Sequence, residues 1–215
     1  MRALPPFFQK DIFLFANLVE SRDTVRFWPQ KRWKKILLIA LLAVIITLAL
    51  FSVYAGIKIN SDVLTPLVVR NPEGAKTALV LFHPGLSSFS QDVSYAFADG
   101  LVSNDWRVEI ATPSREAPTD LSKYSLLVIT SNTYAFTPDP PTTRHLERIG
   151  DLNGIQTVLL TLGAGSAEGS KQALENMVKA SNGTITESLL LYNIAPNEGD
   201  KSATEIARQI AQQTT

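Results

Sequence analysis

The chain has 215 residues, with 20 Lys and Arg balanced by 20 Asp and Glu, and it contains no cysteine. The lack of cysteine excludes disulfides, thiolate nucleophiles, cysteine-ligated metals and Fe–S clusters. Charge is uneven: residues 1–35 hold eight Lys or Arg against three Asp or Glu, whereas residues 58–215 hold twelve against seventeen. Because the larger part is mildly acidic, we expect no nucleic-acid partner.

A long apolar run near the N-terminus predicts a membrane-spanning helix. Residues 36–57, ILLIALLAVIITLALFSVYAGI, carry no charge, and as a helix they would extend about 33 Å, enough for a hydrocarbon core of about 30 Å. The basic, tryptophan-containing stretch RFWPQKRWKK precedes the run, whereas only Lys58 follows it closely. The positive-inside rule then predicts a single-pass protein of the cell membrane, with its N-terminus cytoplasmic and its C-terminal domain outside. The lipid bilayer is therefore a predicted partner.

Alternatives remain open in this region. Val53-Tyr54-Ala55 could serve as a signal-peptide cleavage site, although 35 residues before the apolar core would be unusually long. Four upstream apolar residues have helical spacing, which is consistent with an amphipathic helix on the membrane surface or with a disordered tail. They are Phe8, Ile12, Phe15 and Val19. The predicted organisation is a basic segment (1–35), a transmembrane helix (36–57), a linker (58–75) and a domain (76–215).

Strand-like and helical patterns alternate within the predicted domain. Five apolar runs have strand length: Ala78–Phe82, Arg107–Ala111, Leu126–Thr130, Thr157–Leu162 and Ser188–Tyr192. Continuous apolar strands with helical crossovers predict a parallel sheet covered on both faces. The expected fold class is therefore α/β, a five-stranded parallel sheet in a three-layer sandwich. Ligands of such sheets bind beyond the carboxyl ends of the strands, which draws attention to the loops after the first, third and fourth strands.

The first of these loops, FHPGLSSFSQD, places a glycine and three serines between a strand and a helix. Hydroxyls and the N–H groups of a helix start can hold a dianionic phosphate without lysine or arginine. Asp92, in the first helical turn, suits the helix but would repel a phosphate if it faced inward. A serine-rich helix cap without any ligand is the simpler interpretation.

At these residues the domain resembles the flavodoxin-like family, over roughly residues 76–212. That family typically has a Ser/Thr-x-Thr-Gly-x-Thr loop after its first strand, and residues 85–90 fall on it. Ser87 and Ser90 supply two of the three hydroxyls, whereas Gly85 takes the first hydroxyl position and Ser88 replaces the glycine. The resemblance implies an FMN cofactor with its phosphate at Gly85, Ser87, Ser88 and Ser90.

The loop after the third strand, TSNTYAFTPDPP, resembles the Ser-Pro-Thr-Tyr loop that flanks the isoalloxazine in this family. Ser131, Thr133 and Tyr134 match it, and the resemblance implies that Tyr134 stacks on the flavin ring. Asn132 stands where the family often has proline. Phe136 stands where it often has glycine, and could add a second wall or fill the site itself. An exposed turn aromatic that packs on the loop's own prolines remains the alternative.

The loop after the fourth strand, TLGAGSAEG, supplies small residues where the backbone could approach a flavin ring. They are Thr161, Gly163, Ala164, Gly165 and Ser166, of which Gly163, Gly165 and Ser166 are predicted cofactor-binding residues. The glycine spacing also hints at a dinucleotide fingerprint, but that motif needs an acid near the end of the next strand, and none follows Tyr192 directly.

A hydrolase is a further alternative, since LVLFHPGLSS resembles the oxyanion loop of α/β-hydrolases. However, the sequence has no G-x-S-x-G, and both histidines precede Ser166, so a triad in that family's order cannot be assembled. We expect structural roles for both histidines, with His83 at a strand end and His145 on a solvated helix face. Two isolated histidines also give no metal-binding spacing.

The resemblance therefore implies a membrane-anchored flavoprotein that binds FMN and transfers electrons at the membrane surface, near a quinone or a membrane-bound redox partner. The competing hypothesis is a flavin-free, anchored binding module of the same fold. The altered phosphate loop favours it, as does a location outside the cell, where FMN is usually scarce. Fold alone does not decide between them.

Overall fold

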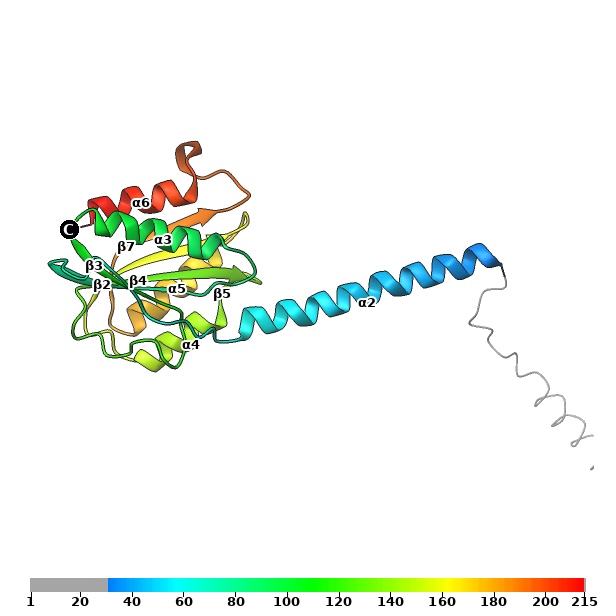
Figure 1. Cartoon of the computed structure of the whole chain (residues 1–215), viewed down its shortest axis with the longest axis horizontal. Helices are drawn as coiled ribbons and strands as arrows, with labels where there is room; N and C mark the ends of the chain where they lie inside the picture. The colour runs from blue at the N-terminus through cyan, green and yellow to red at the C-terminus, as the bar shows by residue number, and fades with distance from the viewer. Residues whose placement is uncertain (1–30, 215) are drawn as a thin grey trace, which may run out of the picture. The chain divides into compact units, whose positions relative to one another are not determined.

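The computed structural model describes residues 31–214 (Figure 1). The first described element is α2 (Arg32–Asn60), a 29-residue helix that contains the whole predicted span. It is long and apolar enough to cross a membrane, and none of its side chains is buried. A signal sequence near the N-terminus would have the same character. The amphipathic helix predicted around Phe8–Val19 lies outside the described residues.

The C-terminal domain is built on a seven-stranded sheet with the order β1-β3-β2-β4-β6-β7, in which β5 pairs with β4. The strands are β1 (Val68–Arg70), β2 (Lys76–Phe82), β3 (Trp106–Ala111), β4 (Leu126–Tyr134), β5 (Thr137–Pro138), β6 (Gln156–Gly163) and β7 (Thr184–Tyr192). The five predicted strands are present and pair in parallel. The predicted strand count was wrong, because β1 and β5 add two antiparallel pairings. At three and two residues, they are too short to show a strand periodicity.

Helices cover both faces of the sheet, which confirms the three-layer sandwich (Figure 1). They are α3 (Phe89–Val102), α4 (Pro140–Ile149), α5 (Glu168–Ala180) and α6 (Ala203–Gln213), with a 3-10 turn, η1 (Glu198–Asp200), before the last. Phe97 of α3 and Ala211 of α6 belong to the core of one face. Gly100 lets these two helices approach closely, because a Cβ there would lie 2.6 Å from the Cβ of Ala211. Leu146 of α4 and Leu174 of α5 belong to the core of the other face.

The chain between α2 and β1 is bound to the domain rather than free. We call residues 60–63 the docking segment. Arg144 of α4 donates to the carbonyl oxygen of Asn60 at 2.7 Å and to the carboxylate of Asp62 at 2.6 Å. Nε2 of His83 lies 3.2 Å from the carbonyl oxygen of Ser61. Burial acts to raise the pKa of Asp62, but the hydrogen bond and positive charge of Arg144 outweigh it and hold that pKa below its ordinary value. The docking segment is thus tied to the carboxyl end of β2 and to α4.

Candidate functional site

A small cleft lies at the carboxyl ends of β2, β4 and β6, where the sequence predicts a ligand. Its volume is about 150 Å³. All three predicted loops contribute to its lining, which consists of Leu86, Ser87, Phe89, Asn132, Thr133, Tyr134, Leu162, Gly163, Ala164 and Asn193. Of the ten predicted site residues, this cleft brings together Ser87, Thr133, Tyr134 and Gly163. The other six lie behind it, beside it or on the exposed surface.

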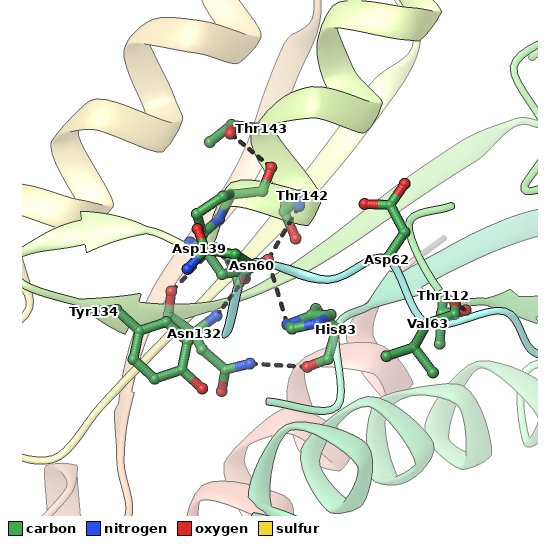
Figure 2. Close-up of polar contacts among 12 residues, drawn as sticks. Asn60, Asp62, Val63, His83, Thr112, Asn132, Tyr134, Asp139, Thr142 and Thr143 are labelled. Atoms are coloured by element: carbon green, nitrogen blue, oxygen red, sulfur yellow. Dashed lines mark hydrogen bonds and ion pairs between the residues drawn. The ribbon is translucent and has the colours of Figure 1, made fainter. Parts of the chain in front are cut away.

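The β2–α3 loop is covered by side chains from β4. Gly85 has a φ of +65°, and a Cβ there would clash with the Tyr134 hydroxyl oxygen and lie 2.9 Å from Nδ2 of Asn132. The Tyr134 hydroxyl accepts a hydrogen bond from the Leu86 N–H at 3.3 Å. The Asn132 side chain donates to the carbonyl oxygen of His83 at 2.8 Å (Figure 2). The absence of a side chain at Gly85 therefore makes room for Tyr134. The Tyr134 hydroxyl in turn accepts a hydrogen bond from the Leu86 N–H, a backbone donor that would bind phosphate in a phosphate-binding loop.

The three serines of this loop have different surroundings. Ser87 is exposed, and its Oγ accepts from the Phe89 N–H at 3.4 Å. Ser88 donates to Oδ2 of Asp92 at 2.8 Å, so this hydroxyl holds the acid at the start of α3. Ser90 is fully buried, and its Oγ has no hydrogen-bond partner. Among these three serines, only Ser90 has a buried hydroxyl without a partner, and it does not line the cleft.

The three predicted site residues of β4 also have different surroundings. Ser131 is buried behind the cleft and donates to Oδ2 of Asp139 at 2.9 Å. Thr133 lines the cleft, and its Oγ1 is buried without a partner. Burial raises the pKa of the Tyr134 hydroxyl above its ordinary value. The Tyr134 hydroxyl contacts the β2–α3 loop, while the residue also lines the cleft.

Phe136 neither walls nor fills the cleft, contrary to both uses considered for it. It lies in the two-residue turn between β4 and β5, with 68% of its surface exposed. Both turn residues have positive φ, +47° at Ala135 and +65° at Phe136. Such a turn normally takes Asn or Gly, because a bulky side chain in this conformation is strained.

The third loop gives the cleft only Gly163 and Ala164. Gly163 is required by close packing, since a Cβ there would lie 2.7 Å from the Cβ of Ala167. Gly165 and Ser166 are exposed and outside the lining. Ser166 donates instead to Oε2 of Glu168 at 3.4 Å.

A buried polar cluster supports the cleft from below. Asp139 is fully buried at the start of α4 and accepts from the N–H groups of Thr142 at 3.0 Å and Asn132 at 2.9 Å. Nδ1 of His83 lies 3.7 Å from its Oδ1. Burial raises the pKa of Asp139, and the nearby His83 and the hydrogen bonds offset only part of that rise. Asp139 thus binds the end of β4, and the neighbouring His83 binds the docking segment.

His145 is fully buried, so the expectation of a solvated face was wrong. Its Nε2 lies 3.2 Å from the carbonyl oxygen of Pro118, because α4 packs on the irregular connection that precedes β4. Burial lowers its pKa. Both histidines therefore have structural contacts, and neither lines the cleft.

Two larger clefts lie elsewhere on the domain. One of about 700 Å³ runs along the amino ends of the strands, with Lys76, Trp106 and Gln156 in its lining. Another, of about 530 Å³, lies between α3 and the β7–α6 loop and shares Phe89 and Asn193 with the small cleft. Size alone would select the first. We select the small cleft because ligands of open α/β sheets bind where the strand order reverses, at the carboxyl ends.

Six lining residues lie outside the ten predicted site residues: Leu86, Phe89, Asn132, Leu162, Ala164 and Asn193. Asn132 lies inside the segment that matches the family loop, and Asn193 directly follows the last predicted strand. Their position at carboxyl strand ends is the signal that could have identified them.

Neither a family model nor a curated protein sequence matches this chain. Solved structures do match. A flavodoxin from the domain Archaea has a TM-score of 0.53 at 13% identity, covering 64% of this chain and 94% of that one. A Streptococcus pneumonia flavodoxin scores 0.51 at 13% identity over 63% and 94% of the two chains, and oxidised Flavodoxin 2 from Bacillus cereus scores 0.51 at 17% over 64% and 95%. At such identities the likeness concerns the fold. The C-terminal domain of this chain has the flavodoxin-like fold.

Proposed function

We propose that this chain is a flavodoxin-like protein which α2 anchors in a membrane and which binds FMN at the small cleft. The observation that carries the proposal is the convergence of three loops on one cleft at the carboxyl edge of the sheet. Three buried hydroxyls on these elements, those of Ser90, Thr133 and Thr161, have no partner, and that of Thr133 belongs to a residue that lines the cleft. An unpaired buried hydroxyl is costly, and a polar ligand would satisfy it.

The chain's own residues suggest how the ligand would be held. The N–H groups in the first turn of α3 and the Ser87 hydroxyl would bind the phosphate. Thr133 and the backbone at Gly163 would contact the ring and exclude water from it. A bound flavin would supply electron transfer, which is the cofactor's own chemistry.

One observation favours the second candidate, a flavin-free binding module. The cleft of about 150 Å³ is smaller than the roughly 300 Å³ at the lower end of small-molecule sites. In addition, the Leu86 N–H already donates to Tyr134. An FMN phosphate would therefore compete with Tyr134 for the β2–α3 loop, whereas a flavin-free module would keep this contact.

A flavin titration separates the two candidates. The full chain in lipid nanodiscs is titrated into FMN, and quenching of flavin fluorescence is measured. Tyr134→Phe should tighten binding by about fivefold, because one hydrogen bond of about 1 kcal/mol no longer competes for the loop. Tyr95→Phe serves as the matched control, since Tyr95 packs against Phe82 rather than on the loop. Unchanged FMN fluorescence with wild type and with Tyr134→Phe would favour the flavin-free module.

We further propose that the N-terminus is cytoplasmic and that the domain lies outside the cell, next to a membrane-bound redox partner. The basic residues before α2 support this orientation. Protease added to intact cells should digest the domain. Digestion only after lysis would contradict the outward placement.

A further inference from the structure

Exposed apolar side chains gather at the carboxyl edge of the sheet. Leu86, Phe136 and Ile194 are 45%, 68% and 80% exposed, and they follow β2, β4 and β7. We call these three residues the apolar edge. Among the described residues after Asn60, the other exposed large apolar side chains all lie between residues 64 and 69, on the way into β1. Single exposed apolar residues are common, but here three loops present them at the same edge of the sheet.

Phe136 is held in this exposed position at an energetic cost. Its left-handed conformation is expected to cost about 1–3 kcal/mol for a non-glycine residue, and its side chain is mostly exposed to solvent. The turn is also braced, because a Cβ on Gly169 of α5 would lie 3.4 Å from the Phe136 carbonyl oxygen. A bulky, strained and exposed aromatic residue is better explained by contact with something outside the chain than by folding.

The docking segment places the apolar edge close to the end of α2. Residues from Val53 onward form one compact unit with the domain. Ser61 follows Ile57, the last residue of the apolar run, by four positions, or about 6 Å of helical rise. Its carbonyl oxygen lies 3.2 Å from His83, and Leu86 is three residues further, at most about 11 Å of chain. Once the His83 side chain is included, the β2–α3 loop is therefore within roughly 30 Å of the end of the apolar run.

We propose that Leu86, Phe136 and Ile194 insert into the headgroup layer of the membrane that α2 crosses. The inference rests on the proposed anchoring by α2 but not on flavin binding. The contact is apolar rather than electrostatic, because the same end of the domain carries the exposed acids Asp92 and Glu168. A neutral, zwitterionic bilayer suits it. The small cleft, which Leu86 helps to line, then opens toward lipid, and its ligand or redox partner reaches it from the membrane interface.

The lack of cysteine makes a direct test possible. Single cysteines replace Leu86, Phe136 and Ile194 in the full chain, each carries a nitroxide label, and the protein is placed in phosphatidylcholine nanodiscs at one chain per disc. Collision rates are measured with oxygen, which concentrates in lipid, and with a water-soluble nickel chelate. Gln156→Cys is the matched control, because Gln156 is exposed at the opposite, amino end of β6. Thr137→Cys, on the same turn as Phe136, provides a second label if Phe136→Cys misfolds.

Each outcome decides between specific alternatives. Labels on the apolar edge should show an oxygen-to-nickel ratio several-fold above that at Gln156→Cys. A ratio equal to that of Gln156→Cys would overturn the proposal. A label at Ile46, inside α2, distinguishes failure of the proposed anchor from failure of the proposed membrane contact. If the Ile46 label is exposed to water, α2 does not anchor the chain. If the Ile46 label is in lipid but the labels on the apolar edge are in water, only the membrane contact is refuted. If the labels on the apolar edge are exposed to water at one chain per disc, but their spectra show dipolar broadening at two chains per disc, the apolar edge binds a second copy of the chain instead of lipid.

Discussion

The packing of Tyr134 over Gly85 gives the sharpest test of the site geometry. Gly85→Ala puts a Cβ against the Tyr134 hydroxyl oxygen at a position where φ is +65°. The left-handed backbone costs about 1–2 kcal/mol, and crowding a packed contact costs about 1–3 kcal/mol more. We therefore expect Gly85→Ala to lower the free energy of unfolding by about 2–5 kcal/mol.

Two companion variants divide this cost into its parts. In a Tyr134→Phe background the hydroxyl is absent, so Gly85→Ala should cost less, keeping the backbone strain of about 1–2 kcal/mol and the contact of the new Cβ with the Asn132 amide at 2.9 Å. Gly154→Ala is the control, since Gly154 has a φ of +74° with nothing within 4 Å of its Cβ position, and its cost should not depend on Tyr134. The unfolding free energy is measured by native-state amide exchange of β4 and β6, with the full chain in nanodiscs. If Gly85→Ala costs the same in both backgrounds to within about 0.5 kcal/mol, the tyrosine does not cover this loop.

Three further predictions concern the turn and two carboxylates. Phe136→Gly should be about 1 kcal/mol more stable than Phe136→Ala by the same exchange assay, because a φ of +65° suits glycine; the reverse order, which is usual at loop positions, would contradict the turn. Asp62→Asn should speed exchange of residues 60–65 at pH 7. The pKa of Asp62 in the folded protein lies below its ordinary value of 3.8. The ionised carboxylate therefore stabilises the fold fully at pH values above 3.8, and this contribution is lost as the pH falls through the folded-state pKa. In acid, the exchange rates of Asp62→Asn and wild type should therefore become equal. Glu109→Gln should destabilise the domain at neutral pH: burial acts to raise the pKa of Glu109, but hydrogen bonds from Lys123 and Tyr124 lower it below 4.5, so the effect should fade in acid, and a constant difference would refute the pairing.

The parallel core of the fold could be predicted because its strands are buried on both faces. The run Leu126–Thr130 is buried throughout, so its apolar residues are continuous in sequence. By contrast, β7 begins at Thr184, but its first half is largely exposed and polar, so the sequence revealed only Ser188–Tyr192. The two short antiparallel strands are stabilised by their neighbours rather than by any pattern of their own.

The position of the site could also be predicted, but its internal contacts could not. Parallel strands bring their carboxyl ends to one edge, so the three loops follow from topology alone. The hydrogen bond between Tyr134 and the Leu86 N–H joins residues 48 positions apart. Whether a hydroxyl faces a ligand or its own chain depends on such long-range packing, which neither propensity nor spacing encodes.

The pairing of β1 with β3 removes most of the slack from the connection between α2 and the sheet. A flexible tether of 18 residues would let a domain roam about 24 Å from its attachment point. Here the docking segment and β1 hold two parts of this connection against the domain, with residues 64–67 between them, so the domain stays close to the end of α2.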